Sequence, residues 1–186
     1  MSRAIHIRVS ESVVRTVHVD DGVCAALEMH PVLAPERMAE LLARELEAIG
    51  FVRDGDTARR TGDDGLEITI DLRAATVTVR LGDDSEVSEQ VTMHGRGGAR
   101  TLEADQARVR KRARNELEAK IEERTDELRQ HVTARLEAAL ADVKAELDTA
   151  IGRTTVAALT ERAGQLGEIE SVVDEGNGNI TIKVKL

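Results

Sequence analysis

The chain has 186 residues and is acidic, with 35 Asp and Glu against 26 Lys and Arg and a formal net charge of −9. It contains one Phe and no Trp or Tyr, so any core must be aliphatic. The composition argues against modules that stack bases on aromatic rings, against aromatic-walled ligand pockets, and against surfaces that attract polyphosphate or anionic lipid over the whole molecule.

The beginning of the chain is predicted to form strands. Residues 4–9 alternate apolar and polar side chains, which indicates a half-buried strand. A second strand is predicted over 13–19, after a break at Ser10–Ser12, and Asp20–Gly22 is typical of a turn. The stretch 23–33 is ambiguous and leaves room for a further short strand.

An amphipathic helix is predicted over 35–49. Pro35 suits the first helical position, because its missing N–H would have no partner there. Gly50 suits a left-handed cap after the last turn. Between them, apolar residues recur at a spacing of three to four: Met38, Leu41, Leu42, Leu46 and Ile49.

The middle of the chain is predicted to hold a loop and a β-hairpin. Residues 52–65 are polar and rich in Gly and Asp, which favours a loop. The alternating runs 66–72 and 77–81 flank a short turn and predict the hairpin. Residues 86–93 favour another strand before the glycine-rich stretch 94–98.

The second half of the chain is predicted to be mainly helical. Residues 102–151 contain neither Pro nor Gly, which predicts one long helix or two helices, and 154–166 continue a helical pattern after Gly152. The chain then ends in a hairpin through Gly-Asn-Gly at 176–178, with an alternating final strand over 180–186.

These elements together predict an α+β protein. We expect an antiparallel sheet built from N- and C-terminal strands, one packed amphipathic helix, and a long inserted helical hairpin or coiled-coil arm. The corresponding boundaries are 1–98 for the N-terminal part of the sheet domain, 99–166 for the helical insertion, and 167–186 for a C-terminal hairpin that completes the sheet.

An eleven-residue apolar repeat runs along the long helix. It favours a straight or slightly right-handed packing seam, and a narrow apolar stripe on a charged helix needs cover. Roughly 70 Å of helix is more than a compact domain of this size can cover. The cover could be residues 153–166 folding back, a second copy or a different protein, with the chain's own sheet as the remaining alternative. The predicted partner or oligomer interface comprises Leu117, Ile121, Leu128, Val132, Leu136, Val143 and Leu147.

A basic tract, RVRKRAR, occupies residues 108–114. Its cations surround the helix, and carboxylates follow at 116–127, with Arg112–Glu116 and Arg114–Glu118 spaced as i,i+4 pairs. A duplex-binding surface would keep its cations on one face and free of adjacent carboxylates. We therefore interpret the tract chiefly as a solvated helix end, and leave an anionic partner surface and nucleic acid as alternatives. The residues concerned are Arg108, Arg110, Lys111, Arg112 and Arg114.

Two further motifs suggest chemistry but fit a structural role better. The stretch 94–100 (HGRGGAR) precedes a helix, yet it lacks the spacing of a dinucleotide or P-loop motif, so we expect a flexible connector. His6 and His18 lie on neighbouring predicted strands and could converge with Asp20 or Asp21 in a sheet-face site. No paired metal-ligand spacing accompanies them, which favours polar positions on an outer face.

The single cysteine and the chain start bear on location. Cys24 cannot form an intramolecular disulfide and has no recognisable His or Asn partner, so we expect a buried thiol and not a nucleophile. The first residues lack a signal-peptide run, and no window approaches the roughly 18 apolar residues of a membrane helix. We expect a cytoplasmic protein with no cofactor, no metal and no membrane contact.

The two ends of the chain resemble known families. The last 30 residues, AALTERAGQLGEIESVVDEGNGNITIKVKL, are similar to the helix–strand–turn–strand ending of a small uncharacterised family of cyanobacteria and plastids. That ending and the start, MSRAIHIRVSESVVRTVHVDDGV, are together similar to accessory domains encoded beside bacterial FtsH-type AAA+ ATPases, MoxR ATPases and von Willebrand A proteins, the FtsH ternary systems. This resemblance implies an accessory component of an NTP-dependent chaperone or conflict system, without catalytic residues.

The leading hypothesis is therefore a non-catalytic accessory or assembly protein that uses its helical seam to bind a protein partner or to form a homo-oligomer. Leu128→Asp combined with Val132→Asp is expected to change association and leave the sheet folded. Two alternatives remain: a nucleic-acid-associated factor that uses residues 108–114, and an enzyme with a site around His6 and His18.

Overall fold

The structure is a computed structural model that describes residues 5–62, 64–98, 100–174 and 180–185. Its described part is α+β, as predicted, with a long and a short helix beside antiparallel strands. In chain order the elements are β1 (Ile5–Ala26), α1 (Pro35–Ala48), β2 (Val52–Asp54), β3 (Thr57–Thr61), β4 (Leu66–Asp71), β5 (Thr76–Gly97), α2 (Leu102–Leu166), β6 (Glu168–Asp174) and β7 (Ile180–Lys185).

The chain divides into two compact units. Unit 1 combines Met1–Asp20 with Gly82–Ala134, and unit 2 combines Asp21–Leu81 with Arg135–Leu186. The elements β1, β5 and α2 each supply residues to both units.

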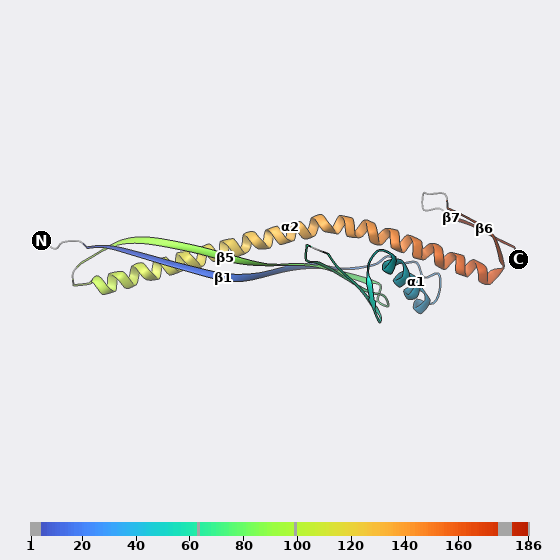
Figure 1. The fold of residues 1–186 in the computed structure, drawn as a ribbon, viewed down its shortest axis with the longest axis horizontal. Coiled ribbons are helices and arrows are strands. Elements are labelled where there is room, and N and C mark those ends of the chain that lie inside the picture. Colours follow the sequence, from blue (N-terminus) through green and yellow to red (C-terminus); the bar gives the residue numbers. More distant parts are fainter. Residues whose placement is uncertain (1–4, 63, 99, 175–179, 186) are drawn as a thin grey trace. The chain divides into compact units, whose positions relative to one another are not determined.

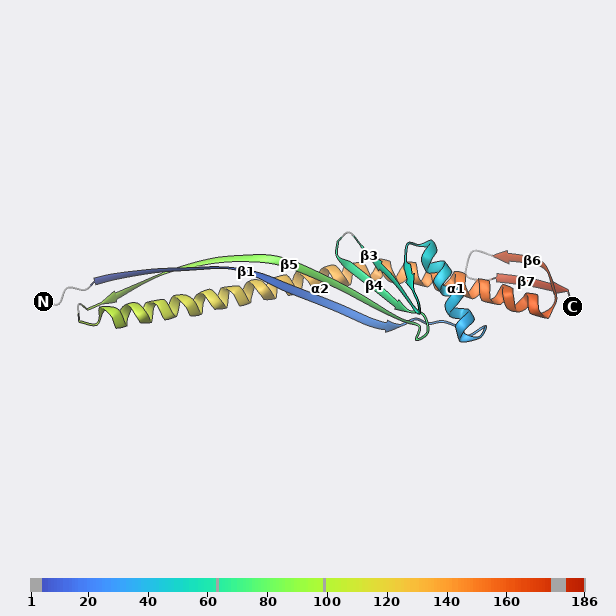
Figure 2. The ribbon, with the colours of Figure 1, turned by 60° about the horizontal axis from the view of Figure 1, so that its bottom comes forward.

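In unit 1, β1 and β5 form a two-stranded ribbon that lies along the first part of α2 (Figures 1 and 2). Ser10 Oγ lies 2.9 Å from Thr92 Oγ1, and His18 Nδ1 lies 2.7 Å from Asp84 Oδ1. Both contacts join residues eight apart on each strand, in opposite order, so the strands are antiparallel and keep one register between these points. Alternate residues of the ribbon turn toward α2 and are more buried than those between them.

The predicted break within the first strand is wrong. β1 runs through Ser10–Ser12 and through Asp20–Gly22. The alternation survives at Glu11, whose carboxylate faces inward because Arg110 and Arg114 of α2 lie 3.4 and 3.8 Å from it. A charged residue at an inward position therefore breaks the apolar alternation in the sequence, although the strand continues through it.

In unit 2, strands β2 to β5 pair in the order β5-β4-β3-β2, each antiparallel to the next. The predicted hairpin of β4 and β5 is confirmed, and Asp71 Oδ1 accepts the backbone N–H groups of Arg73 and Ala74 in its turn. The predicted loop over 52–65 is wrong, since β2 and β3 lie there. Their sequence shows little apolar alternation because Ala58, fully buried, is the inward residue of β3.

The short helix α1 forms as predicted. Its apolar stripe is buried, with Leu42 and Leu46 fully covered. Met38 and Leu41 pack against Ala158 of α2, and Gly50 takes the left-handed conformation expected after the helix, with φ +92°.

The rest of the second half differs from the prediction in two ways. α2 is one continuous helix through Gly152, because an exposed glycine without competing contacts weakens a helix without having to end it. The C-terminal strands β6 and β7 pair with each other in a separate two-stranded sheet, so they do not complete the N-terminal sheet as expected. The predicted turn at 176–178 lies outside the described residues.

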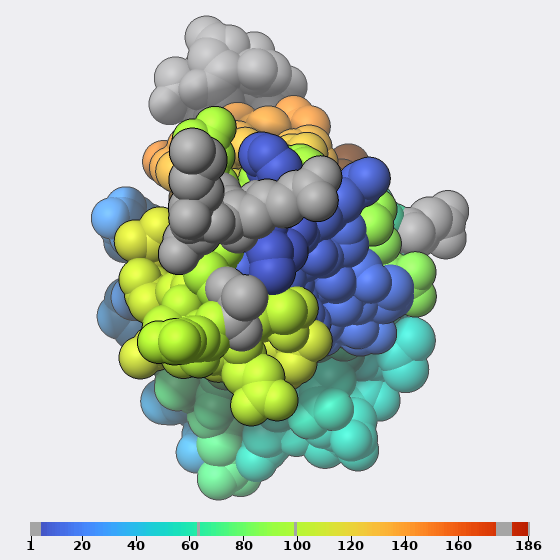
Figure 3. All heavy atoms as spheres, turned by 90° about the vertical axis from the view of Figure 1, so that its left-hand side faces the viewer, coloured from blue at the N-terminus to red at the C-terminus, as the bar shows by residue number. Residues whose placement is uncertain are grey.

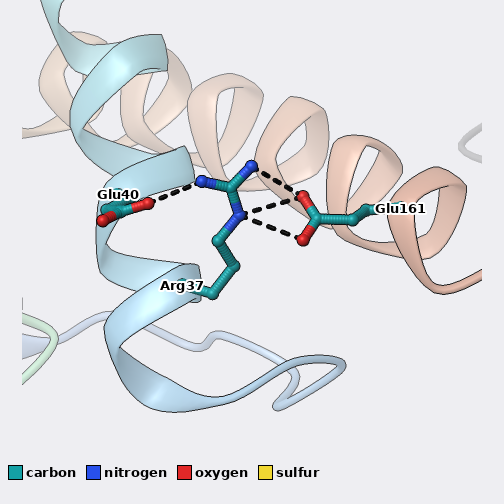
Figure 4. Close-up of polar contacts among 3 residues, drawn as sticks. All are labelled: Arg37, Glu40 and Glu161. Atoms are coloured by element: carbon teal, nitrogen blue, oxygen red, sulfur yellow. Dashed lines mark hydrogen bonds and ion pairs between the residues drawn. The ribbon is translucent and has the colours of Figure 1, made fainter. Parts of the chain in front are cut away.

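An ion pair fastens α1 to the end of α2 (Figure 4). Arg37 Nε donates to both carboxylate oxygens of Glu161, at 3.0 and 2.9 Å, while its two terminal nitrogens reach Glu161 and Glu40. The hydrogen bond from Arg37 lowers the pKa of Glu161, and the bonds to Glu161 and then Glu40 raise the pKa of Arg37. The geometry is that of a charge-assisted fork, the stronger kind of surface pair.

Glu161→Gln should reduce the free energy of unfolding near neutral pH. The Glu161 pKa is lowered in the folded chain, so its ion pair stabilises above the ordinary value of 4.5, and that stabilisation is lost as pH falls through the lowered pKa. Denaturant titrations at several pH values should show the wild-type advantage shrinking below pH 4.5. Glu170→Gln, an exposed carboxylate, is the control; an advantage that persists unchanged in acid would contradict the pair's role.

Candidate interaction surfaces

The predicted helical seam is covered within the chain. Of its seven residues, six are at most 7% exposed, and Leu128 is half-buried. In unit 1, Leu117 and Ile121 form one cluster with Val91 of β5, against which Val9 and Val13 of β1 also pack. The remaining alternative, a helix lying on the chain's own sheet, describes this part of the chain. The other buried seam residues are Val132, Leu136, Val143 and Leu147.

The eleven-residue repeat itself is confirmed. Ile121, Val132, Val143 and Thr154 follow one another at intervals of eleven, and all four are buried. Thr154 continues the line beyond the predicted residues, and its hydroxyl donates to the carbonyl of Ala150 at 2.8 Å. The repeat therefore predicts which helix face is buried, but not that the same chain supplies the cover.

The predicted convergence of His6 and His18 in one site is wrong. His6 and His18 lie on one strand, twelve residues apart, which separates them by about 40 Å at ~3.3 Å per residue. His18 instead pairs with Asp84, and Asp20 lies farther off at 3.9 Å. The side chains of His18 and Asp84 are 63% and 73% exposed, so the pair is solvated. The hydrogen bond to Asp84 is the main cause that raises the pKa of His18.

Cys24 also differs from its prediction. Its side chain is exposed near the end of β1, whereas a buried thiol was expected. Throughout the described ranges, no three His, Cys, Asp or Glu side chains are arranged to hold a metal ion.

The basic tract at the start of α2 is solvated and only partly paired. Arg108 contacts Asp105 one turn earlier at 2.6 Å, and Arg110 and Arg114 share Glu11 of β1. The two i,i+4 pairs expected with Glu116 and Glu118 do not form among the described residues. Lys111 and Arg112 have no ion pair in the described part of the chain.

The strands add further cations to the same end of unit 1. Figure 3 shows the start of β1 and the start of α2 side by side on one face. Over 5–15, 92–98 and 100–115 there are nine Lys and Arg against three Asp and Glu, a net charge of +6. Sequence reasoning counted charge along the helix alone and missed Arg8, Arg96 and Arg100, which the ribbon and its connection bring to this end. We call this region the basic end.

The remainder of unit 1 has the opposite charge. Over 16–20, 82–91 and 116–134 there are three Lys and Arg against eleven Asp and Glu, a net charge of −8. We call this region the acidic stretch. Unit 1 is thus nearly neutral as a whole and strongly polarised along its helix, a pattern hidden by the chain total.

The glycine-rich stretch 94–98 has a packing role at the basic end. A Cβ atom on Gly95 would lie 2.5 Å from Val109 Cγ2, and one on Gly97 would lie 3.0 Å from Ile7 Cδ1. Gly95 and Gly97 belong to β5, so the predicted flexible connector is wrong for them. Only residues without a side chain let β1, β5 and α2 approach so closely here.

Clefts border these elements in both units. At the basic end, a cleft of about 420 Å³ is lined by side chains that include His94, Arg96, Arg108 and Arg112. In unit 2, a more apolar groove of about 440 Å³ runs between the end of β1, the start of β5 and α2. Neither helix in the described residues combines the length and apolar character that crossing a membrane requires.

The comparisons with known proteins give one finding. A family model described as FtsH ternary system domain X5 matches residues 1–186, which confirms the second resemblance noted in the sequence. Comparison with curated proteins and with solved structures returns no match. The likeness of residues 157–186 to a cyanobacterial and plastid family stays a prediction.

Val132→Asp should destabilise the fold itself, whereas the sequence alone predicts altered association and an intact sheet. Val132 is 1% exposed, so the carboxylate would be buried without a partner, at a cost of about 3 kcal/mol or more. Chemical denaturation followed by circular dichroism measures this. Ala134→Asp, at an exposed position two residues away, is the control and should change stability little.

The pKa of His18 should lie above its ordinary value of 6.5 and fall toward it in Asp84→Asn. Because the folded pKa is raised, the pair's stabilisation is complete below pH 6.5 and lost as pH rises through the folded pKa. Proton–carbon NMR titration of the ring tests this, with Asp20→Asn expected to have the smaller effect. Equal pKa values in wild type and Asp84→Asn would refute the contact.

Proposed function

This chain belongs to the FtsH ternary system domain X5 family, and on that premise we propose that it is a non-catalytic accessory component that binds another protein of its system through unit 1. The proposal keeps the interaction arm inferred from the sequence and changes the surface through which it acts. The buried seam holds the arm together, and the charged outer faces are left for recognition.

The observation that carries this proposal is the cover over the first part of α2. Residues Leu102–Ala134 span about 50 Å of helix, and the ribbon contributes Val9, Val13 and Val91 to their apolar side. A single helix with a narrow apolar stripe is marginal in water, whereas one packed on strands along its length is ordered before it meets a partner. Pre-ordering of this kind lowers the entropic cost of binding.

The solvated state of the titratable groups favours binding over catalysis. A general acid or base needs a pKa tuned by burial or by close charges in a pocket. In unit 1, the pKa shifts of His18 and Arg124 come mainly from surface hydrogen bonds with carboxylates, and the lowered pKa of Asp105 comes mainly from a hydrogen bond with the Thr101 hydroxyl. Groups of this kind belong to a solvated surface, which favours an accessory role over a catalytic one.

A nucleic-acid-associated role is the second candidate, and the net charge of +6 at the basic end is the observation that favours it. Against it, the acidic stretch begins at Glu116, directly after the tract, where it would repel a phosphate backbone laid along α2. The chain also has only one aromatic residue on which a base could stack, Phe51, and it is buried.

Co-expression of the tagged full chain with the other protein components of an FtsH ternary system tests the proposal. At least one component should co-purify, and amine crosslinking should map the contact. The chain has five lysines, of which Lys111 and Lys120 lie in unit 1, and Lys144, Lys183 and Lys185 lie in unit 2. We expect intermolecular crosslinks from the unit 1 lysines. Failure of every component to co-purify, or crosslinks from unit 2 alone, would contradict the proposal.

A further inference from the structure

The exposed surface of α2 in unit 1 carries its charges in two consecutive blocks. The basic block is the five cations within 108–114, and the acidic block is the six carboxylates within 116–127. All eleven side chains belong to exposed residues, while the intervening apolar residues, Val109, Ala113, Leu117 and Ile121, face the ribbon. The order of the blocks is therefore displayed outward, where another molecule can meet it.

The chain neutralises these blocks only in part, since Arg108, Arg110 and Arg114 contact Asp105 or Glu11. Within the described ranges, Lys111 and Arg112 have no ion pair, and neither do Glu118 and Glu122. At the end of the acidic block, Arg124 contacts Glu127 at 2.6 Å, and Arg129 contacts Asp126 at 2.7 Å. Each block therefore keeps charges, such as Lys111 and Glu118, that no ion pair within the described residues neutralises.

We propose that two copies of this chain associate through unit 1, side by side and antiparallel, with the basic block of each copy against the acidic block of the other. This inference rests on the proposed function, in which unit 1 is the interaction surface, and it names a second copy as the occupant. The two contacts are related by a two-fold axis, so the assembly closes as a dimer.

The block spacing fits this arrangement. A two-fold axis close to Glu116 sets Lys111 opposite Glu122 of the second copy and Arg114 opposite Glu118 of the second copy. Lys111 and Glu122 are eleven residues, or about 16 Å, apart on one helix, so both contacts can form along one pair of helices. A parallel arrangement would set like charges against each other.

Charge complementarity also extends to the ribbon. The ribbon residues of the basic end include Arg8 and Arg96, and those of the acidic stretch include Asp84 and Glu86. Both layers of unit 1 therefore have the same polarity, and an antiparallel copy matches both. A polyanion without cations of its own, such as duplex nucleic acid, could match the basic end alone.

Charge-swap variants of the full chain test the proposal by sedimentation velocity over a range of protein concentrations. Lys111→Glu with Arg114→Glu reverses the two basic positions of these contacts, and Glu118→Lys with Glu122→Lys reverses the two acidic positions. Each double variant should lose self-association, and the two mixed together should recover it as a heterodimer. The chain with all four changes has both contacts reversed in sign and should again dimerise with itself.

Two controls test whether the charge swaps act through these contacts and not through loss of the fold. Arg59→Glu with Arg153→Glu reverses two exposed charges in unit 2 and should leave dimerisation unchanged. Circular dichroism should show that every variant keeps its helix. The dissociation constant of the wild-type dimer should rise by about tenfold or more between 0.1 and 1 M NaCl, because salt screens exposed ion pairs.

A wild-type chain that stays monomeric at all concentrations overturns the inference, and so does a dimer that the charge swaps leave intact. Tight, salt-sensitive binding of a 20-base-pair duplex by a monomeric wild-type chain would assign the basic block to nucleic acid instead. Failure here is distinct from failure of the proposed function. A monomer that still captures a system component refutes only the dimer, whereas a dimer that captures none refutes only the accessory role.

Discussion

The fold of unit 1 depends on the burial of one aliphatic stripe of α2 beneath the ribbon of β1 and β5. The stripe consists of small and medium side chains, such as Ala113, Leu117 and Ile121. Val9, Val13 and Val91 of the ribbon pack against it. Without aromatic residues, close approach replaces bulk, and the glycines at 95 and 97 allow it where α2 begins. A helix and a two-stranded ribbon are each marginal alone, and they stabilise each other by this contact.

The same burial determines which surface is free for function. An apolar seam that the chain covers itself is no longer available to a partner without unfolding. What remains outward is charge, and its distribution is far from uniform, with +6 at the basic end and −8 in the acidic stretch. Recognition by such a surface is sensitive to salt, orientation and the sign of the partner, which suits an accessory protein that must choose among components.

Much of the fold follows from the sequence because local patterns determine it. Pro35, the apolar spacing and Gly50 specify α1, and the alternating runs on either side of residues 72–75 specify the β4–β5 hairpin. The patterns fail where a long-range partner changes their meaning. Glu11 looks like a break until Arg110 and Arg114 are found beside it, and β3 looks like a loop because Ala58 is its buried residue.

The candidate surface, like the fold, is predicted from the sequence only where local patterns determine it. The eleven-residue repeat gives the buried face of α2, since Ile121, Val132 and Val143 are all covered, but periodicity does not say what covers it. The basic end needs strand pairing to bring Arg8 and Arg96 to the helix start. The most direct test of the account is amide hydrogen exchange on the monomeric chain at low concentration. It predicts slow exchange in β1, β5 and the first part of α2 together; rapid exchange in the strands, with α2 protected only when the protein is concentrated enough to associate, would contradict it.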